Sequence, residues 1–159
     1  MYIMFNSQFE SEGEMEKIAV IALGNTLRKD DAVGIVLRKK LGKRIEIIDG
    51  GTGALKLIDV LSRHDRIIFL DAIDFGGAPG DLKIFDLEDV DGEKLFSTHS
   101  FDIKKLVELS KILYDKPREV VIVGIQPKDM SYGLDLSQEI RNRLDKISEK
   151  MIKILEGMI

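Results

Sequence analysis

Four short apolar runs constrain the fold of this chain more than any other feature of its sequence. The runs are residues 18–23, 45–48, 67–70 and 120–123. Each run is followed directly by Gly or Asp, which is typical of short strands in a sheet that is buried on both faces. The segments between the runs repeat apolar residues at helical spacing. Strands that alternate with helices predict an α/β fold with a mainly parallel sheet.

A fifth strand and a long final helix complete the predicted architecture. The turn residues 75–80 precede apolar residues within 82–87, and so short a connection makes this strand antiparallel at a sheet edge. From about Ser137 one apolar stripe predicts a helix packed on the sheet, formed by Ile140, Leu144, Ile147, Met151, Ile154 and Met158. Two shorter helices are expected around Leu55, Ile58 and Leu61 and around Phe101, Leu106, Leu109 and Leu113. We therefore expect a three-layer α/β sandwich, with a mainly parallel five-stranded sheet, one antiparallel edge strand and helices on both faces.

Length and charge limit the domain organisation and the partners. A chain of 159 residues suffices for one domain, so we expect an N-terminal extension at residues 1–14 and a single α/β domain at residues 15–159. The start of the chain lacks the basic and apolar regions of a signal peptide, and no later apolar run could span a bilayer. A net charge of −4 argues against a nucleic-acid partner, which requires a basic surface. The sequence thus predicts a cytoplasmic protein without membrane or nucleic-acid partners, and nothing in it demands more than a monomer.

Two carboxylates and one imidazole are the best candidates for chemistry. Asp71 directly follows a buried strand, Asp31 lies in the first turn of the helix after the first strand, and His99 lies in a polar loop. Ligands of open α/β sheets bind at the carboxyl ends of the strands, where these side chains would converge. The chain contains no Cys, so carboxylates and imidazole would have to hold any metal ion. The three residues together form a plausible site for a borderline divalent metal.

Each of these residues also has an ordinary structural explanation. Asp30 and Asp31 could both be acids at a helix N-terminus, and for Asp30 we prefer that interpretation. Asp71 could cap the turn that follows it, and an isolated loop residue such as His99 is most often only solvated. The Gly51-Thr52-Gly53 segment lacks the rest of a phosphate loop. Ser97 and Ser100 lie near His99 but lack the G-x-S-x-G elbow of a hydrolase, so we discount them as nucleophiles.

Five segments in the expected order closely resemble the hydrogenase maturation proteases, endopeptidases that finish the large subunit of nickel–iron hydrogenases. They are residues 24–34, Asp49-Gly50-Gly51-Thr52, Asp71-Ala72, Thr98-His99-Ser100 and Gly124-Ile125-Gln126-Pro127. The resemblance implies that Asp31, Asp71 and His99 are both metal ligands and catalytic residues. It also implies that Asp49, Gly50, Gly51 and Thr52 recognise the substrate. One departure is Ala32, where many members of the family have Gly, although Gly34 is retained.

The resemblance also implies an unusual use of metal. The enzyme would remove a C-terminal peptide from a hydrogenase large-subunit precursor and would recognise the nickel that the substrate supplies, with no tightly bound cofactor of its own. The nickel could polarise the scissile carbonyl or activate a water, or an aspartate, preferably Asp71, could act as general base in an aspartyl-type mechanism. Two alternatives remain open at this point: a self-contained metallohydrolase that uses the same three residues, and a nickel-dependent chaperone that binds the large subunit without cutting it.

Overall fold

A five-stranded sheet forms the centre of the computed structural model, which describes residues 15–90 and 95–159. The expected extension at residues 1–14 lies outside these described residues. The strands are β1 (Ile18–Leu23), β2 (Ile48–Gly51), β3 (Arg66–Ala72), β4 (Leu82–Asp86) and β5 (Glu119–Ile125). Their order is β2-β1-β3-β5-β4, and all pairs are parallel except β4 with β5. The mainly parallel sheet with one antiparallel edge strand is therefore confirmed.

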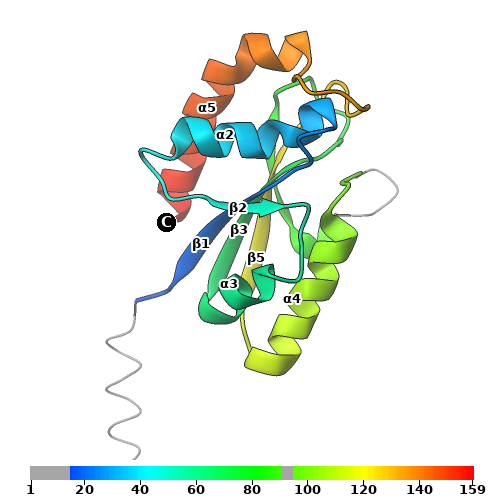
Figure 1. Cartoon of the computed structure of the whole chain (residues 1–159). Helices are drawn as coiled ribbons and strands as arrows, with labels where there is room; N and C mark the ends of the chain where they lie inside the picture. Colours follow the sequence, from blue (N-terminus) through cyan, green and yellow to red (C-terminus); the bar gives the residue numbers. More distant parts are fainter. Residues whose placement is uncertain (1–14, 91–94) are drawn as a thin grey trace, which may run out of the picture.

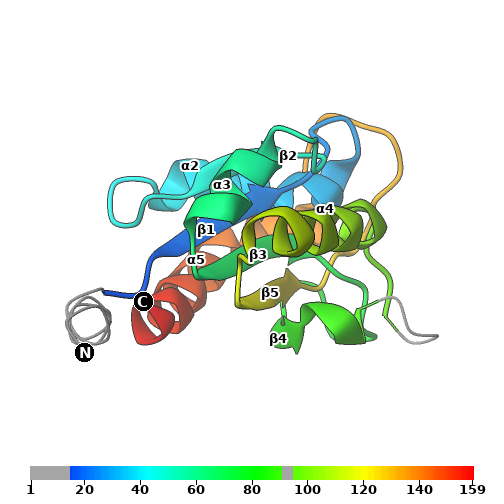
Figure 2. The same cartoon turned by 90° about the horizontal axis from the view of Figure 1, so that it is seen from below.

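Helices cover both faces of the sheet, as Figures 1 and 2 show. The helices are α2 (Val33–Leu41), α3 (Leu57–Arg63), α4 (Ser100–Tyr114) and α5 (Gln138–Met158), with short 3-10 turns η1 (Lys29–Ala32) and η2 (Leu87–Asp89). Helices α2 and α5 share one hydrophobic core with the sheet, and α3 and α4 share the other. The predicted three-layer sandwich is confirmed. No helix within residues 15–90 and 95–159 has the length and apolar content needed to cross a bilayer.

The two cores follow from the alternation of side chains along the strands. In β3, Ile68 and Leu70 belong to the core under α2 and α5, whereas Ile67 and Phe69 belong to the core under α3 and α4. Burying each of these side chains contributes about 1.5–3 kcal/mol. Asp71 lies two residues after Phe69, so the same alternation directs its carboxylate toward the layer of α3 and α4.

Glycine at position 34 allows the first helix to lie directly on the ends of two strands. A Cβ atom there would lie 2.7 Å from the carbonyl oxygen of Leu23 and 2.8 Å from that of Leu70, which is too close for any side chain. These carbonyls belong to β1 and β3, which are neighbours in the sheet. The close packing therefore holds η1, which directly precedes α2, over the carboxyl ends of β1 and β3.

The structure corrects several expected boundaries. The second strand was expected at residues 45–48 but is Ile48–Gly51, because Ile45 and Ile47 pack onto the core from a segment that precedes the strand. The third strand extends to Ala72 and contains Asp71. Helix α3 begins at Leu57, so Leu55 lies outside it.

The buried face of α4 also differs from the expected one. Phe101, Leu109 and Leu113 are exposed, and the helix instead buries Ile103, Val107 and Ser110. Both sets have helical spacing, so the sequence pattern alone does not distinguish the two faces. For α5 the expectation is confirmed: Ser137 caps the helix, and Ile140, Ile147 and Met151 of the predicted stripe are buried.

Candidate functional site

The three predicted site residues meet at the carboxyl ends of β1 and β3. Asp31, Asp71 and His99 each offer one ligand atom, and these atoms all lie within 4.8 Å of one another. The connection after β1 leads through α2 to β2, whereas the connection after β3 leads to β4 and then through α4 to β5, so the two connections run toward opposite edges of the sheet. Consequently the chain diverges between β1 and β3, the position where open α/β sheets bind ligands. The trio, as we name Asp31, Asp71 and His99, thus lies where the strand order predicts a site.

Asp31 is held by three hydrogen bonds from two segments, the one that follows β1 and the loop before α4. Its Oδ2 accepts the backbone N–H of Asn25, which follows β1, at 2.9 Å, and its Oδ1 accepts the hydroxyl of Thr98 at 2.7 Å. The Nε2 atom of His99 lies 2.9 Å from Oδ2. Asp31 is fully buried, so these contacts replace the water that the carboxylate loses.

Asp71 has one satisfied and one unsatisfied carboxylate oxygen. Ser97 donates its hydroxyl to Oδ2 at 2.5 Å. The Oδ1 atom is buried and has no hydrogen-bond partner of good geometry among the described residues, and the weaker contact of the Ala72 backbone with this carboxyl does not offset its burial. A buried carboxylate oxygen without a donor is rare in folded proteins and points to a ligand that binds there.

His99 links the beginning of α4 to the trio. Its backbone carbonyl accepts the N–H of Ile103, so the first helical turn fixes its position. Its imidazole is hydrogen-bonded to the backbone of Thr52, and since Nε2 faces Asp31, Nδ1 is the ring nitrogen left for this contact. His99 retains 4% of its exposed area, whereas Asp31 and Asp71 retain none, so the trio is reached from the His99 side.

The buried charges shift the pKa values of the trio in different directions. Burial raises the pKa of Asp71 to about 7, because the ionised carboxylate loses its hydration. Burial acts the same way on Asp31, but hydrogen bonds from His99 and Thr98 outweigh it and lower its pKa. Burial lowers the pKa of His99, but the hydrogen bond to Asp31 and the charges of both aspartates outweigh it and raise the pKa. A proton lies between His99 Nε2 and Asp31 Oδ2, which are 2.9 Å apart, and a cation bound by both atoms must displace it.

The donor set fits a borderline divalent metal ion. It consists of one imidazole nitrogen and two carboxylate oxygens, a combination suited to nickel or zinc. The orphaned Oδ1 of Asp71 supports the same conclusion, because a cation would satisfy it. Three protein ligands leave further coordination positions open to groups from a substrate or to water.

The four residues from Asp49 to Thr52 line the same edge of the sheet but do not join the trio. Asp49, Gly50 and Gly51 form most of the edge strand β2, and the Asp49 carboxylate accepts the N–H of Gly51 at 2.9 Å. Gly51 has a positive φ of 51°, and nothing lies within 4 Å of where its Cβ would be. Only Thr52 contacts the trio, through the hydrogen bond between its backbone and His99.

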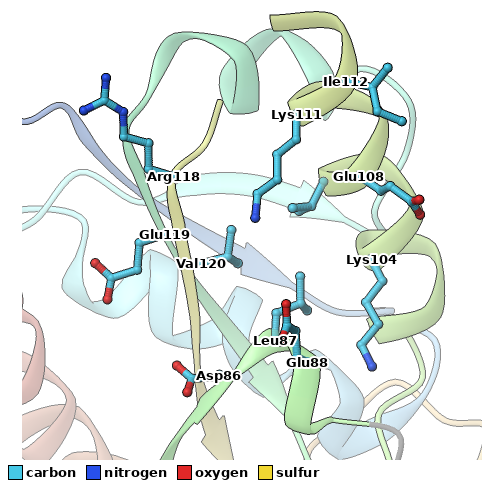
Figure 3. Close-up of a pocket in the computed structure, with 11 residues that line it drawn as sticks. Asp86, Leu87, Glu88, Lys104, Glu108, Lys111, Ile112, Arg118, Glu119 and Val120 are labelled. Atoms are coloured by element: carbon cyan, nitrogen blue, oxygen red, sulfur yellow. The ribbon is translucent and has the colours of Figure 1, made fainter. Parts of the chain in front are cut away.

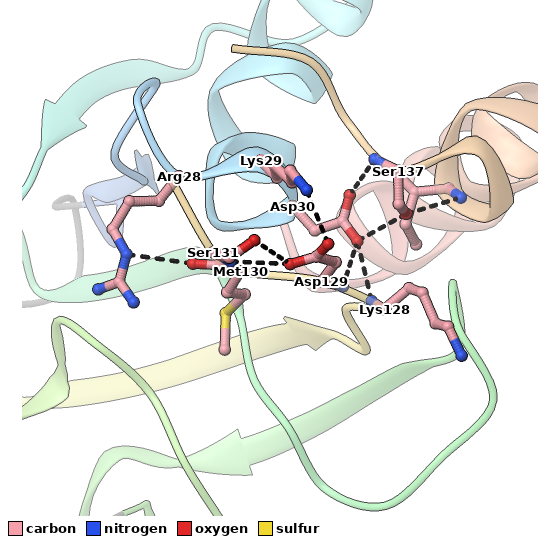
Figure 4. A network of polar contacts seen from close by, with 9 residues as sticks. Arg28, Lys29, Asp30, Lys128, Asp129, Met130, Ser131 and Ser137 are labelled. Atoms are coloured by element: carbon pink, nitrogen blue, oxygen red, sulfur yellow. Dashed lines mark hydrogen bonds and ion pairs between the residues drawn. The ribbon is translucent and has the colours of Figure 1, made fainter. Parts of the chain in front are cut away.

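Asp30 has a structural role that differs from the expected one. It does not cap a helix; it is fully buried and faces the segment before α5 (Figure 4). Its carboxylate accepts the backbone N–H groups of Lys128, Asp129 and Ser137 and the hydroxyl of Ser137, at 2.7 to 2.9 Å. The two consecutive aspartates therefore point to different partners, Asp30 to this segment and Asp31 to the trio.

Sequence reasoning missed two residues of the site. Ser97 had been discounted and Thr98 had been noted only within a motif, yet their hydroxyls bind Asp71 and Asp31. Their position next to His99 in a polar loop was the only available signal. Gln126 has a supporting role: its side chain accepts the N–H groups of Phe75 and Gly77 in the turn after β3.

A groove elsewhere on the molecule carries none of these features. It has a volume of ≈ 680 Å³ and lies between α4, η2 and the start of β5 (Figure 3). Its lining includes basic and acidic side chains: Lys104, Lys111, Arg118, Glu88, Glu108 and Glu119. No residue of the trio lines it. The candidate chemistry is therefore at the strand ends and not in this groove.

Comparison with known proteins gives consistent matches over most of the chain. A sequence model of the hydrogenase maturation protease family matches residues 33–154. The hydrogenase expression/formation protein HupD of Bradyrhizobium diazoefficiens is 31% identical over 138 residues, which cover 80% of this chain and 72% of HupD. The hydrogenase maturating endopeptidase HybD from E. coli, 24% identical, superposes with a TM-score of 0.73 over 89% of this chain and 93% of its own. The NiFe hydrogenase maturation protease HybD from Thermococcus kodakarensis is 25% identical, with a TM-score of 0.72 over 87% and 98%.

Proposed function

The chain belongs to the hydrogenase maturation protease family, and we propose that it removes a C-terminal peptide from the nickel-loaded precursor of a hydrogenase large subunit. As a member of this family it is a peptidase. The observation that carries the proposal is the trio itself, in which ligand atoms from three distant segments lie within 4.8 Å of one another and one Asp71 oxygen is unsatisfied. Such a cluster suits a metal ion that arrives with the substrate.

The donor types explain how the protein would recognise nickel without removing it. The precursor's nickel would be held by cysteine thiolates, which are soft ligands that bind it firmly. This chain has no Cys, so it offers only carboxylates and an imidazole, which do not outcompete thiolates. The trio would therefore complete the coordination of the ion and leave it in the precursor. An empty precursor would present no ion, which would make cleavage depend on nickel insertion.

The same residues would activate the scissile bond. The bound nickel would polarise the peptide carbonyl or lower the pKa of an attacking water. Asp71 is the preferred general base, because its carboxylate lies within the trio and its Oδ1 accepts no hydrogen bond of good geometry from the described residues. Its Oδ2 is occupied by Ser97, so Oδ1 is the atom that would act, as metal ligand or as base.

The edge strand β2 is the proposed substrate-recognition element. Gly51 has open space around its Cα atom, so an extended segment of the precursor could approach its backbone closely. The Asp49 carboxylate accepts the N–H of Gly51, and Gly50 packs on β1, so the strand is held against the sheet. Thr52 joins this strand to the trio through His99, which would place a docked segment near the metal.

One observation favours a second function, a self-contained metallohydrolase. Three protein ligands plus an open position are also the arrangement of many catalytic zinc sites. Such an enzyme would retain a metal ion through purification and would cleave small peptides or esters without a nickel-loaded precursor. Metal analysis of the purified protein, together with an assay on small substrates, distinguishes it from the protease proposed above.

The proposed function is tested with a large-subunit precursor prepared with and without nickel. Mass spectrometry after incubation with this protein should show loss of a short C-terminal peptide only in the nickel-loaded sample. Asp71→Asn and His99→Ala should abolish the cleavage. His64→Ala is the matched control, because it removes the other histidine, which lies beyond α3 and contacts Val60.

Three outcomes contradict parts of the proposal. Cleavage of both precursors would remove nickel as the trigger and retain the protease. Normal cleavage by Asp71→Asn or His99→Ala would remove the trio as the site. Stable binding of the loaded precursor without any cleavage would favour a nickel-dependent chaperone.

A further inference from the structure

We propose that Ser97 is a positioning residue that fixes the Asp71 carboxylate so that its Oδ1 atom faces the metal ion. This inference rests on the proposed function, because it assumes that the trio binds the substrate's nickel. It extends that function by assigning which atom of each residue is the ligand. It also gives a role to a serine that the reaction itself does not use.

The two carboxylate oxygens of Asp71 have different surroundings. Ser97 Oγ donates to Oδ2 at 2.5 Å, while Oδ1 is buried and unpaired among the described residues. Both side chains are buried, with Asp71 at 0% and Ser97 at 7% exposure, so water does not replace this contact easily. A carboxylate whose one oxygen is held in this way has a fixed plane, and its other oxygen has a fixed direction.

Thr98, which follows Ser97, makes a similar hydrogen bond to Asp31. Thr98 donates its hydroxyl to Oδ1 at 2.7 Å, and Oδ2, which also accepts the N–H of Asn25, faces His99 Nε2 at 2.9 Å. Two consecutive hydroxyls thus each occupy one oxygen of one aspartate. The third residue, His99, supplies the remaining ligand. The geometry assigns Asp71 Oδ1, Asp31 Oδ2 and His99 Nε2 as the three donor atoms.

The backbone around Ser97 explains why its hydroxyl reaches Asp71. Phe96 and Asp74 form an isolated antiparallel bridge, with backbone hydrogen bonds of 2.9 and 3.0 Å in both directions. Asp74 follows Asp71 by three residues, and Phe96 precedes Ser97 by one, so the bridge sets the two side chains opposite each other. The Asp74 carboxylate is itself held by the Gln126 amide at 3.0 Å. The bridge to Asp74, which Gln126 in turn holds, therefore fixes the backbone next to Ser97.

Ser97 requires a hydroxyl and not merely a small side chain. Its Oγ donates to Asp71 and also accepts the backbone N–H of His99 at 3.3 Å. Alanine would lose both contacts, whereas threonine keeps an oxygen that donates and accepts. Comparison of Ser97→Ala with Ser97→Thr thus separates the loss of the hydroxyl from a general disturbance of the loop.

The test is a titration of the isolated full-length protein with Ni²⁺, followed by NMR of the histidine side chains. The chain has two histidines, His99 in the trio and His64 outside it, so His64 is an internal reference. Paramagnetic Ni²⁺ bound at the trio broadens the His99 signals at concentrations that leave His64 sharp. In Ser97→Ala the midpoint of this broadening should rise about 10- to 100-fold, as expected when a group that orients a metal ligand is lost. Ser97→Thr should recover most of the affinity.

Ser110→Ala is the matched control. Ser110 is fully buried and donates its hydroxyl to the Lys116 carbonyl at 2.7 Å, on the far part of α4. It should reduce the melting temperature about as much as Ser97→Ala while leaving the Ni²⁺ midpoint unchanged. With nickel-loaded precursor, Ser97→Ala should lower kcat and raise KM, because the trio is proposed both to bind the precursor's nickel and to activate the scissile bond.

The possible outcomes distinguish the role of Ser97 from the proposed function of the trio. Equal Ni²⁺ midpoints for Ser97→Ala and wild type, with equal kcat, would overturn the role of Ser97 and leave the proposed function intact. Asp71→Asn that keeps the wild-type midpoint would remove Asp71 as a ligand and with it the role of Ser97, whereas the proposed function fails only if this variant also cleaves the loaded precursor normally. Equal loss of affinity in Ser97→Ala and Ser110→Ala would show a general effect of loosened packing and would also overturn the role of Ser97.

Discussion

Replacing Asp30 with asparagine is expected to destabilise the protein strongly although it leaves the trio unchanged. The Asp30 carboxylate is fully buried and accepts four hydrogen bonds, three from backbone N–H groups and one from the Ser137 hydroxyl. These bonds join η1 to the segment before α5, as Figure 4 shows. Asparagine has nearly the same shape, but it offers one acceptor oxygen and replaces the other with an amide that can only donate.

The expected loss of unfolding free energy in Asp30→Asn follows from which carboxylate oxygen accepts each hydrogen bond. Oδ2 accepts three of the four bonds, from Lys128 N, Asp129 N and Ser137 Oγ, and Oδ1 accepts the fourth, from Ser137 N. With the amide oxygen at the Oδ2 position, the Ser137 N–H would face another donor, which costs about 1–3 kcal/mol. The other three bonds would change from charge-assisted to neutral, a loss of roughly 1 kcal/mol each. Since the effects are not fully additive, we expect a total loss of about 3 to 5 kcal/mol.

Urea denaturation followed by far-UV circular dichroism measures this loss as a change in the free energy of unfolding. Asp135→Asn is the control, because Asp135 is an exposed aspartate in the same segment and its change should stay within about 0.5 kcal/mol. Asp30→Asn within about 1 kcal/mol of the wild type would refute the reasoning. It would mean that the carboxylate does not hold this segment in solution.

The remaining predictions concern the trio and the packing around it. Because burial raises the pKa of Asp71 to about 7, its contribution to stability is present at low pH and is lost as the pH rises through 7. The unfolding free energy of Asp71→Asn minus that of the wild type should therefore increase by about 3 kcal/mol between pH 5 and pH 8.5, and a pH-independent difference would contradict the raised pKa. Gly34→Ala should lower the free energy of unfolding by about 3 kcal/mol or more and reduce cleavage, because the alanine Cβ would meet backbone carbonyls at 2.7 and 2.8 Å. A crystal structure of the variant in which η1 has not moved would disprove this prediction. Asp49→Ala removes the bond to Gly51 N and should raise KM for the precursor while the Ni²⁺ midpoint at His99 stays constant; a lower Ni²⁺ affinity would instead place Asp49 in the metal site.

The position of the trio could be predicted because it depends on features that the sequence displays. Asp71 directly follows apolar residues of a strand, and the parallel topology brings strand ends to one edge of the sheet. The role of Asp30 could not be predicted in this way. Asp30 and Asp31 are adjacent and chemically identical, and the partners that distinguish them lie up to 107 residues away along the chain. Only the folded chain shows that Asp30 binds the segment before α5 and that Asp31 belongs to the trio.

The edge strand β2 illustrates a second limit. Asp49, Gly50 and Gly51 have the composition of a turn, and we had expected the strand to end before them. In the structure they pair with β1, where Ala22 faces Asp49 and Leu23 faces Gly51. Pairing with a buried neighbour thus overrides weak local preference. The roles of Ser97 and Thr98 were missed for the same kind of reason, since their partners become visible only when the loop meets the sheet.

The way in which Asp30 holds the segment before α5 determines which positions can change in sequence. Three of its four bonds go to backbone N–H groups, which every residue except proline possesses. These three bonds therefore hold the backbone at positions 128, 129 and 137 for any side chain except proline, while the Asp129 carboxylate adds bonds of its own to Ser131. Tyr132 and Leu134 lie on this segment with 82% and 80% of their area exposed. Substitution of Tyr132 or Leu134 would thus change the surface of this segment and leave the four bonds of the buried aspartate in place.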